Sequence, residues 1–129
     1  MAGLHHVEIW VSDESRADDA WDWFLEAVGL RCASRWPGGS SWEAGGAYVT
    51  LTRSPNTVDA PHDRRRPGMN HIAFSLAGTG EVDRIMRDAI AHGWTPLYDG
   101  RYPHAGGPDH YAGWLENEDG FKVELVAVG

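Results

Sequence analysis

The chain carries one sequence pattern twice, and this repeat limits the folds it can adopt. A histidine opens an alternating apolar and polar stretch at residues 6–11 and again at residues 71–76. Each stretch precedes a helix-like segment that ends at a glycine, Gly29 and then Gly93. The interval between His6 and His71 is 65 residues, and that between the glycines is 64. Because the two intervals are nearly equal, they predict one module used twice, with equivalent histidines in two half-sheets.

Hydrophobic periodicity predicts the elements of each copy. Residues 6–11 alternate with period two, which predicts a strand with one buried face. A helix over 15–28, with Ser12 or Asp13 as a capping residue, and strands at 30–36, 41–43 and 47–52 complete the first copy. The second copy has a strand at 70–76, a helix at 80–92 and strands at 95–98, 111–115 and 122–128. We therefore expect one α+β domain over residues 1–129, with β-α-β-β-β modules at 4–53 and 70–128 and a linker at 54–69.

Composition and charge exclude several classes of function. The 129 residues are 42% hydrophobic with seven Trp, which is enough for a sizeable core. The formal charge of −8 argues against nucleic-acid binding, because phosphate groups require a basic surface. A single cysteine, Cys32, excludes an internal disulfide. No signal-peptide pattern and no apolar run of about 18 residues is present, so we expect a cytoplasmic protein without a membrane partner.

Strand parity gathers potential metal ligands on one predicted face. His6, His71 and Glu124 all project to the face that the helices leave free. Two imidazoles and a carboxylate are costly to bury without partners, and a divalent cation would satisfy all three. This ligand set suits non-haem Fe(II), and equally Zn, Ni, Mn or Co. The competing interpretation is that each histidine is an ordinary hydrogen-bonded or surface residue.

Other candidates flank this set. Glu8 shares the free face and could be a base, a ligand or a residue at the rim. His110 follows a Gly/Pro-rich loop and could carry a proton or simply be solvated. His5 falls on the opposite face from His6, which favours a surface role. Four aromatic residues could contact a small molecule or could belong to the core: Trp10, Tyr48, Tyr111 and Trp114.

Three segments of the chain resemble the vicinal oxygen chelate superfamily, which includes glyoxalase I, fosfomycin-resistance transferases, bleomycin-resistance proteins and extradiol dioxygenases. The segments are His-Val-Glu-Ile-Trp-Val-Ser-Asp at 6–13, Asn-His-Ile-Ala-Phe at 70–74 and Asn-Glu-Asp-Gly-Phe-Lys-Val-Glu-Leu at 117–125. The resemblance implies paired modules whose mixed sheet curls around a metal cleft, with the helices outside. It implies His6, His71 and Glu124 as ligands. Thr50 stands where many members have a fourth ligand, which departs from the four-ligand glyoxalase pattern.

The resemblance implies a divalent-metal-dependent enzyme, dioxygenase-like or a lyase or isomerase. It would act on a small oxygen-rich molecule chelated to the metal, with Glu8 or His110 moving a proton. The alternative is a non-catalytic binding or resistance protein that holds a small molecule in an aromatic cleft. We also expect a homodimer, with the modules paired within one chain or swapped between chains.

Overall fold

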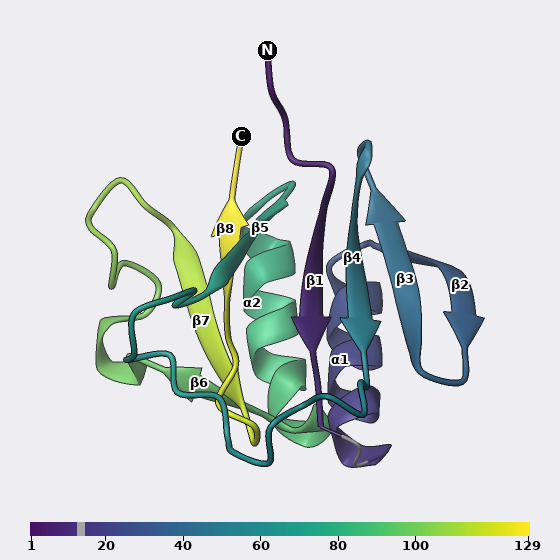
Figure 1. The fold of residues 1–129 in the computed structure, drawn as a ribbon. Coiled ribbons are helices and arrows are strands. Elements are labelled where there is room, and N and C mark those ends of the chain that lie inside the picture. Colours follow the sequence, from purple (N-terminus) through teal and green to yellow (C-terminus); the bar gives the residue numbers. More distant parts are fainter. Residues whose placement is uncertain (13–14) are drawn as a thin grey trace. The chain divides into compact units, whose positions relative to one another are not determined.

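A computed structural model describes residues 1–12 and 15–129, without the side chains of 15–18, and it forms two compact units, Met1–Ala60 and Pro61–Gly129. The boundary between the units falls inside the stretch 54–69 that was predicted as a linker. Across the described residues each unit has one α-helix and one four-stranded sheet, drawn in Figure 1. The α+β class and the repeated β-α-β-β-β order are therefore confirmed. The predicted cap at Asp13 lies outside the described residues.

Unit 1 has the strand order β1-β4-β3-β2. Strand β1 runs parallel to β4, and the other neighbours are antiparallel. Its elements are β1 (His6–Trp10), α1 (Ser15–Ala27), β2 (Arg31–Trp36), β3 (Gly39–Ala44) and β4 (Ala47–Thr52). The predicted alternation is visible in the burial, since Ile9 is 2% exposed whereas His6, Glu8 and Trp10 are exposed. Gly29 ends the α1 segment at a φ of 98°, a conformation that glycine adopts without strain.

Unit 2 repeats this topology in the order β5-β8-β7-β6, again with a parallel pair, β5 and β8. Its elements are β5 (Ile72–Leu76), α2 (Thr79–Asp88), η1 (Ala89–His92), β6 (Trp94–Leu97), η2 (Asp99–Arg101), β7 (Ala112–Asn117) and β8 (Lys122–Ala127). The helix predicted at 80–92 is thus an α-helix followed by a 3-10 turn. Gly93 closes the turn at a φ of 90°.

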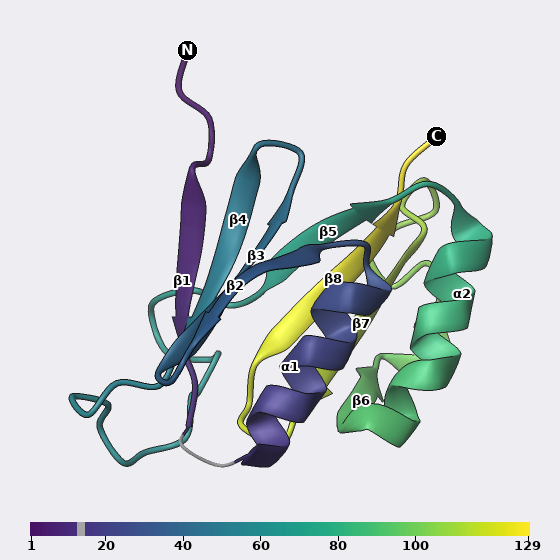
Figure 2. The same cartoon turned by 90° about the vertical axis from the view of Figure 1, so that its right-hand side faces the viewer.

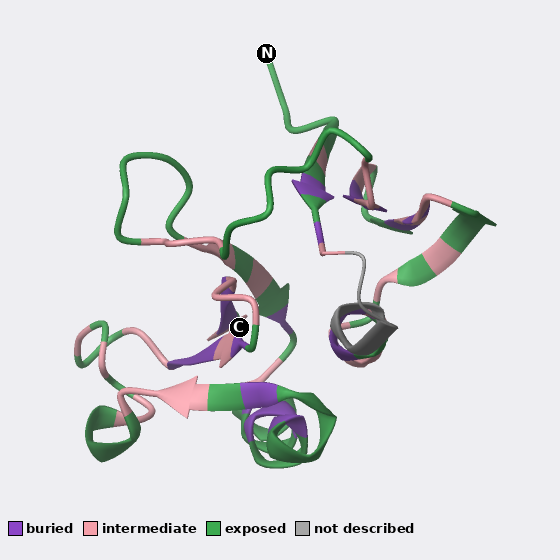
Figure 3. Cartoon of the chain, turned by 60° about the horizontal axis from the view of Figure 1, so that its bottom comes forward, coloured by how far each residue is buried: buried purple, intermediate pink, exposed green. Residues whose placement is uncertain are grey.

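Helix α2 covers one face of the unit 2 sheet, where it lies along β7 and β8 (Figure 2). Val82, Ile85 and Met86 recur at helical spacing and are buried, while the opposite side of the helix is exposed (Figure 3). Gly113 on β7 faces Met86 so closely that a side chain there would collide with the thioether. The other face of this sheet, opposite the helix, is the one that carries Glu124. Among the helices of the described residues, none is long and apolar enough to cross a membrane.

Candidate functional site

The carboxylate of Glu124 is the centre of the candidate site in unit 2. It lies on β8, in register with Ala73 of β5 and Trp114 of β7, and its residue is only 6% exposed. Its Oε1 lies 2.9 Å from His71 Nε2, and its Oε2 lies 2.5 Å from His110 Nε2. Two imidazole nitrogens therefore lie within hydrogen-bond distance of the buried carboxylate that the sequence predicted as a ligand.

The ring of His71 is oriented by its neighbour in the chain. His71 Nδ1 lies 2.7 Å from Asn70 Oδ1, and Asn70 Nδ2 donates to the carbonyl oxygen of Arg64 at 3.0 Å. Because the amide nitrogen is used by that carbonyl, the amide oxygen accepts from His71 Nδ1. Nε2 is then the nitrogen directed at Glu124. Metal-binding histidines are commonly held this way, with one nitrogen anchored and the other presented to the ion.

In unit 1, His6 lies against Tyr48 of β4. The two rings are stacked with their centroids 4.8 Å apart and their planes 8° from parallel. His6 Nδ1 also lies 2.9 Å from His5 Nδ1. The expected separation of the two histidines on opposite faces is therefore wrong. His5 precedes β1, which begins at His6, so strand alternation does not govern where its ring points.

Glu8 and Trp10 form a second exposed contact on β1. Trp10 Nε1 donates to Glu8 Oε2 at 2.8 Å. Glu8 pairs in register with Thr50 of β4, which is 9% exposed. The predicted base and the predicted aromatic contact are thus adjacent. Tyr48 also lines a surface depression with Arg31, Glu43 and the turn at 44–47.

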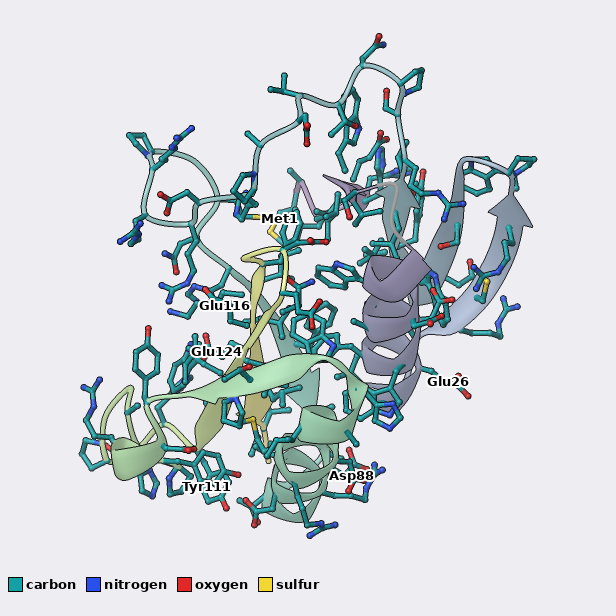
Figure 4. The ribbon with its side chains drawn as sticks, turned by 90° about the horizontal axis from the view of Figure 1, so that it is seen from below. Met1, Glu26, Asp88, Tyr111, Glu116 and Glu124 are labelled. Atoms are coloured by element: carbon teal, nitrogen blue, oxygen red, sulfur yellow. The ribbon has the colours of Figure 1, made fainter. Side chains whose placement is uncertain are left out.

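The aromatic candidates of unit 2 take different positions. Trp114 is 8% exposed and packs edge-on against Tyr98, with ring centroids 5.7 Å apart, and 6.0 Å from the His110 ring. Tyr111, by contrast, donates to Asp83 of α2 at 2.6 Å. Figure 4 shows Tyr111 toward that helix and Glu124 farther from it. A ligand contact by Tyr111 stays a prediction.

Two tyrosines fix the loop before β7 to α2. The hydroxyls of Tyr102 and Tyr111 both donate to Asp83 Oδ1. The hydrogen bond from Tyr102, and after it the one from Tyr111, lowers the pKa of Asp83. The hydrogen bond between Tyr111 and Asp83 raises the pKa of Tyr111. The anchored loop leads directly to His110. Sequence reasoning identified the loop and its histidine but not this anchor, since nothing marked Asp83 among the acidic residues of the helix.

Sequence reasoning also missed the pair formed by Lys122 and Tyr98. Lys122 Nζ donates to Tyr98 Oη at 2.8 Å, and the lysine is only 9% exposed. Strand parity had placed Lys122 on the same face as Glu124, which was an available signal. Tyr98 carried none, because it follows β6 and adopts a left-handed φ of 60°. That hydrogen bond from Lys122 lowers the pKa of Tyr98, against the opposing effect of partial burial.

The three predicted metal ligands come from both units. His71 and Glu124 meet within unit 2, while His6 belongs to unit 1. Among the side chains that the structure describes, those of residues 1–12 and 19–129, no group of three or more His, Cys, Asp or Glu is arranged to hold a metal ion. Within unit 2, His71 and His110 contact different oxygens of Glu124.

Comparison with known proteins places the chain in a family. Residues 5–114 match the family model of the glyoxalase/bleomycin resistance protein/dioxygenase superfamily. The uncharacterized protein YqjT of Bacillus subtilis (strain 168) is 37% identical over 125 residues, which cover 96% of this chain and 98% of YqjT.

Solved structures agree with this match. The crystal structure of a candidate glyoxalase from Bacillus halodurans is 36% identical, with a TM-score of 0.89 over 97% of this chain and 95% of that one. A glyoxalase/bleomycin resistance protein from Albidiferax ferrireducens T118 shares the fold at 20% identity, with a TM-score of 0.75 and 98% of each chain covered. The chain belongs to the glyoxalase/bleomycin resistance protein/dioxygenase superfamily.

Proposed function

We propose that this protein is a divalent-metal-dependent enzyme that acts on a small oxygen-rich molecule, with His6, His71 and Glu124 as the metal ligands. The observation that carries the proposal is the pairing of His71 Nε2 with the buried Glu124 carboxylate at 2.9 Å. The metal would be Fe, Zn, Ni, Mn or Co, all of which accept imidazole and carboxylate ligands.

The geometry of this pair fits a metal site. Ligand atoms at about 2.0–2.2 Å from one ion lie about 3–3.5 Å from each other, close to the separation seen here. Asn70 holds Nδ1 of His71, so its Nε2 is the available nitrogen. In unit 1 the Tyr48 ring fixes the plane of His6. The donor types and their orientation therefore suit the ion that the superfamily uses.

The chain's own residues supply binding and proton transfer. A bound metal ion would act as a Lewis acid toward a carbonyl or enediolate oxygen. His110 lies 2.5 Å from the Glu124 carboxylate and is half-buried, so it can hold a proton beside the substrate. Glu8 is the second candidate base, and its carboxylate is already hydrogen-bonded by Trp10. Trp114 and Tyr48 offer flat apolar surfaces to the carbon skeleton of a ligand.

Metal analysis of protein purified without chelator tests the proposal. We expect about one transition-metal ion per chain in the unmodified protein, and loss of that ion in His6→Ala and His71→Ala. His62→Ala is the matched control, because His62 stacks on Phe121 with ring centroids 4.5 Å apart and is not a proposed ligand. A protein that contains no transition metal, or whose metal content survives both substitutions, would overturn the proposal.

A non-catalytic binding protein is the second candidate function. The observation that favours it is the exposed His6 ring stacked on Tyr48 beside a surface depression, which could hold an aromatic molecule without a metal. One variant, His71→Ala, distinguishes the two candidate functions. If His71→Ala loses metal but binds catechol as tightly as the unmodified protein, the binding function is favoured; if catechol affinity falls with metal content, the enzyme is favoured.

We propose a homodimer in the cytoplasm, and sedimentation velocity at micromolar concentration tests the first part directly. A single species at 14.2 kDa would contradict the dimer.

A further inference from the structure

Lys122 is a buried cation that forms no ion pair with the carboxylate opposite it on the neighbouring strand. Lys122 on β8 stands directly opposite Glu116 on β7, a register that usually produces a cross-strand ion pair. Glu116 instead accepts from Arg64 Nε at 2.7 Å. The next carboxylate on the same face, Glu124, is occupied by two histidines. In the part of the chain that the structure describes, none of the ion pairs includes Lys122.

The ammonium of Lys122 is directed at Tyr98 instead. Nζ donates to the phenol oxygen at 2.8 Å and lies 4.9 Å from the ring centroid. On this tyrosine a second cation, the guanidinium of Arg101, lies 5.2 Å from the same centroid. The charges of Arg64 and Arg101 add to the hydrogen bond from Lys122 in lowering the pKa of Tyr98, which marks the surroundings of the phenol as electropositive.

The position of this pair relative to Glu124 suits a small substrate. Lys122 and Glu124 are two residues apart on one strand and share a face, which separates their Cα atoms by about 6.5–7 Å. Trp114 spans the interval, because it stands opposite Glu124 in register and its ring packs on Tyr98. Tyr98 adopts a non-glycine φ of 60°, a left-handed conformation that costs backbone strain and is found at functional positions.

We propose that Lys122 and Tyr98 form an oxyanion subsite that binds a carboxylate or phosphonate group of the substrate. The proposal rests on the proposed function for the chelating end of the molecule. The substrate would then be a small anion with two adjacent oxygens at one end and a charged group about one aromatic ring away. Lys122 supplies the charge, Tyr98 Oη supplies a hydrogen-bond donor once the anion accepts from it, and Trp114 contacts the carbon frame.

Matched probes test the subsite. We would measure, by calorimetry, binding of 3,4-dihydroxybenzoate, (3,4-dihydroxyphenyl)phosphonate and the neutral 3,4-dihydroxybenzyl alcohol, with and without Zn²⁺. We expect at least one anion to bind about tenfold more tightly than the alcohol, in keeping with a charged hydrogen bond. The anion with the larger advantage identifies the group that the subsite prefers. Equal affinity for all three probes, with and without Zn²⁺, would overturn the proposal.

The Lys122→Met variant keeps the length and bulk of the side chain and removes its charge. In this variant we expect the anion preference to fall to within twofold, with alcohol binding unchanged. Arg87→Met is the matched control, since it makes the same charge change on the exposed side of α2, and it should keep the full preference. Tyr98→Phe should keep part of it, and this second variant tests the subsite even if Lys122→Met unfolds. A preference that survives both substitutions would overturn the proposal.

Zinc is a separate variable in the same experiment. If Zn²⁺ increases the affinity for none of the three probes, while Lys122→Met still abolishes the preference for the anions, the proposed metal function is wrong and the subsite is supported. If Zn²⁺ increases the affinity for all three probes equally and the anions bind no better than the alcohol, the metal function is supported and the subsite is wrong.

Discussion

Strands β1 and β4 of unit 1 pair in the same way as β5 and β8 of unit 2, so matched positions can be compared directly. His6 corresponds to His71 in the repeat. Two residues further along the first strand, unit 1 pairs Glu8 with Thr50, whereas unit 2 pairs Ala73 with Glu124. Each unit thus keeps one carboxylate at this level, but it lies on the first strand in unit 1 and on the last strand in unit 2.

The two carboxylates differ in exposure as well as in place. Glu8 is exposed and needs only Trp10 as a partner. Glu124 is 6% exposed and contacts two imidazoles. A carboxylate can be buried only where cations or donors compensate for lost water, and unit 2 provides them. Unit 2 therefore carries the buried carboxylate of the repeat, whereas Thr50 stands at the matching position in unit 1.

Removing the buried carboxylate should have the largest effect on the proposed site, and metal affinity is the property that measures it. In Glu124→Gln we expect metal affinity to fall at least about 100-fold, because an anionic ligand of the proposed site is replaced by a poor neutral one. Competition with a coloured chelator measures the affinity. Glu116→Gln on the neighbouring strand is the control and should change it less than about threefold. Equal metal affinity in Glu124→Gln and the unmodified protein would show that Glu124 is not a ligand.

Packing beneath the sheets offers a second contrast between the units. Gly113 of β7 stands opposite Leu125, and Ser40 of β3 stands opposite the matching Leu51. Ser40 is 3% exposed and accepts from the buried Trp42 Nε1 at 3.0 Å, whereas a Cβ at Gly113 would require the Met86 side chain to shift.

Gly113→Ala should therefore destabilise the protein by about 1–3 kcal/mol through overpacking. Urea unfolding followed by tryptophan fluorescence measures the change. Met86→Ala in the same chain should relieve part of the cost, because it removes the atoms that the new methyl group meets. If the double variant loses the sum of the two single effects, the collision is not the cause.

The fold was largely predictable from the sequence because each unit follows its hydrophobic period closely. The alternation at 6–11 and the helical spacing at Val82, Ile85 and Met86 both correspond to observed elements. The partners of Glu124 and Lys122 were only partly predictable. Strand alternation predicts which face of a strand a side chain lies on. Which side chains pair on that face depends on loop residues such as Arg64 and Tyr98, whose positions hydrophobic periodicity does not predict.

The tyrosine anchor of unit 2 should give a smaller effect with a characteristic pH dependence. Tyr111→Phe removes one hydrogen bond to Asp83, and we expect a loss of about 0.5–1.5 kcal/mol at neutral pH. The raised pKa of Tyr111 means that its contribution is present below the unfolded value of about 10 and is lost as pH rises through the folded value. The lowered pKa of Asp83 means that its contribution is present above about 4 and is lost in stronger acid.

The difference in unfolding free energy between the unmodified protein and Tyr111→Phe should therefore be greatest between about pH 4 and 10. Urea titrations across this range measure it. A difference that stays constant into strong acid and strong alkali would assign the effect to packing instead of the hydrogen bond.

Thr50 should give the smallest effect, and its size tests whether Thr50 is a further ligand of the proposed metal site. Thr50 occupies the position that Glu124 holds in unit 2, so a fourth ligand would lie here if unit 1 supplied one. A threonine hydroxyl is a weak ligand for transition metals, which prefer imidazole and carboxylate donors. We therefore expect Thr50→Val, of nearly equal volume, to change metal affinity less than about twofold, or about 0.4 kcal/mol. A tenfold loss in the chelator competition would make Thr50 a ligand, and the carboxylate in unit 2 would then be only one of two matched donors.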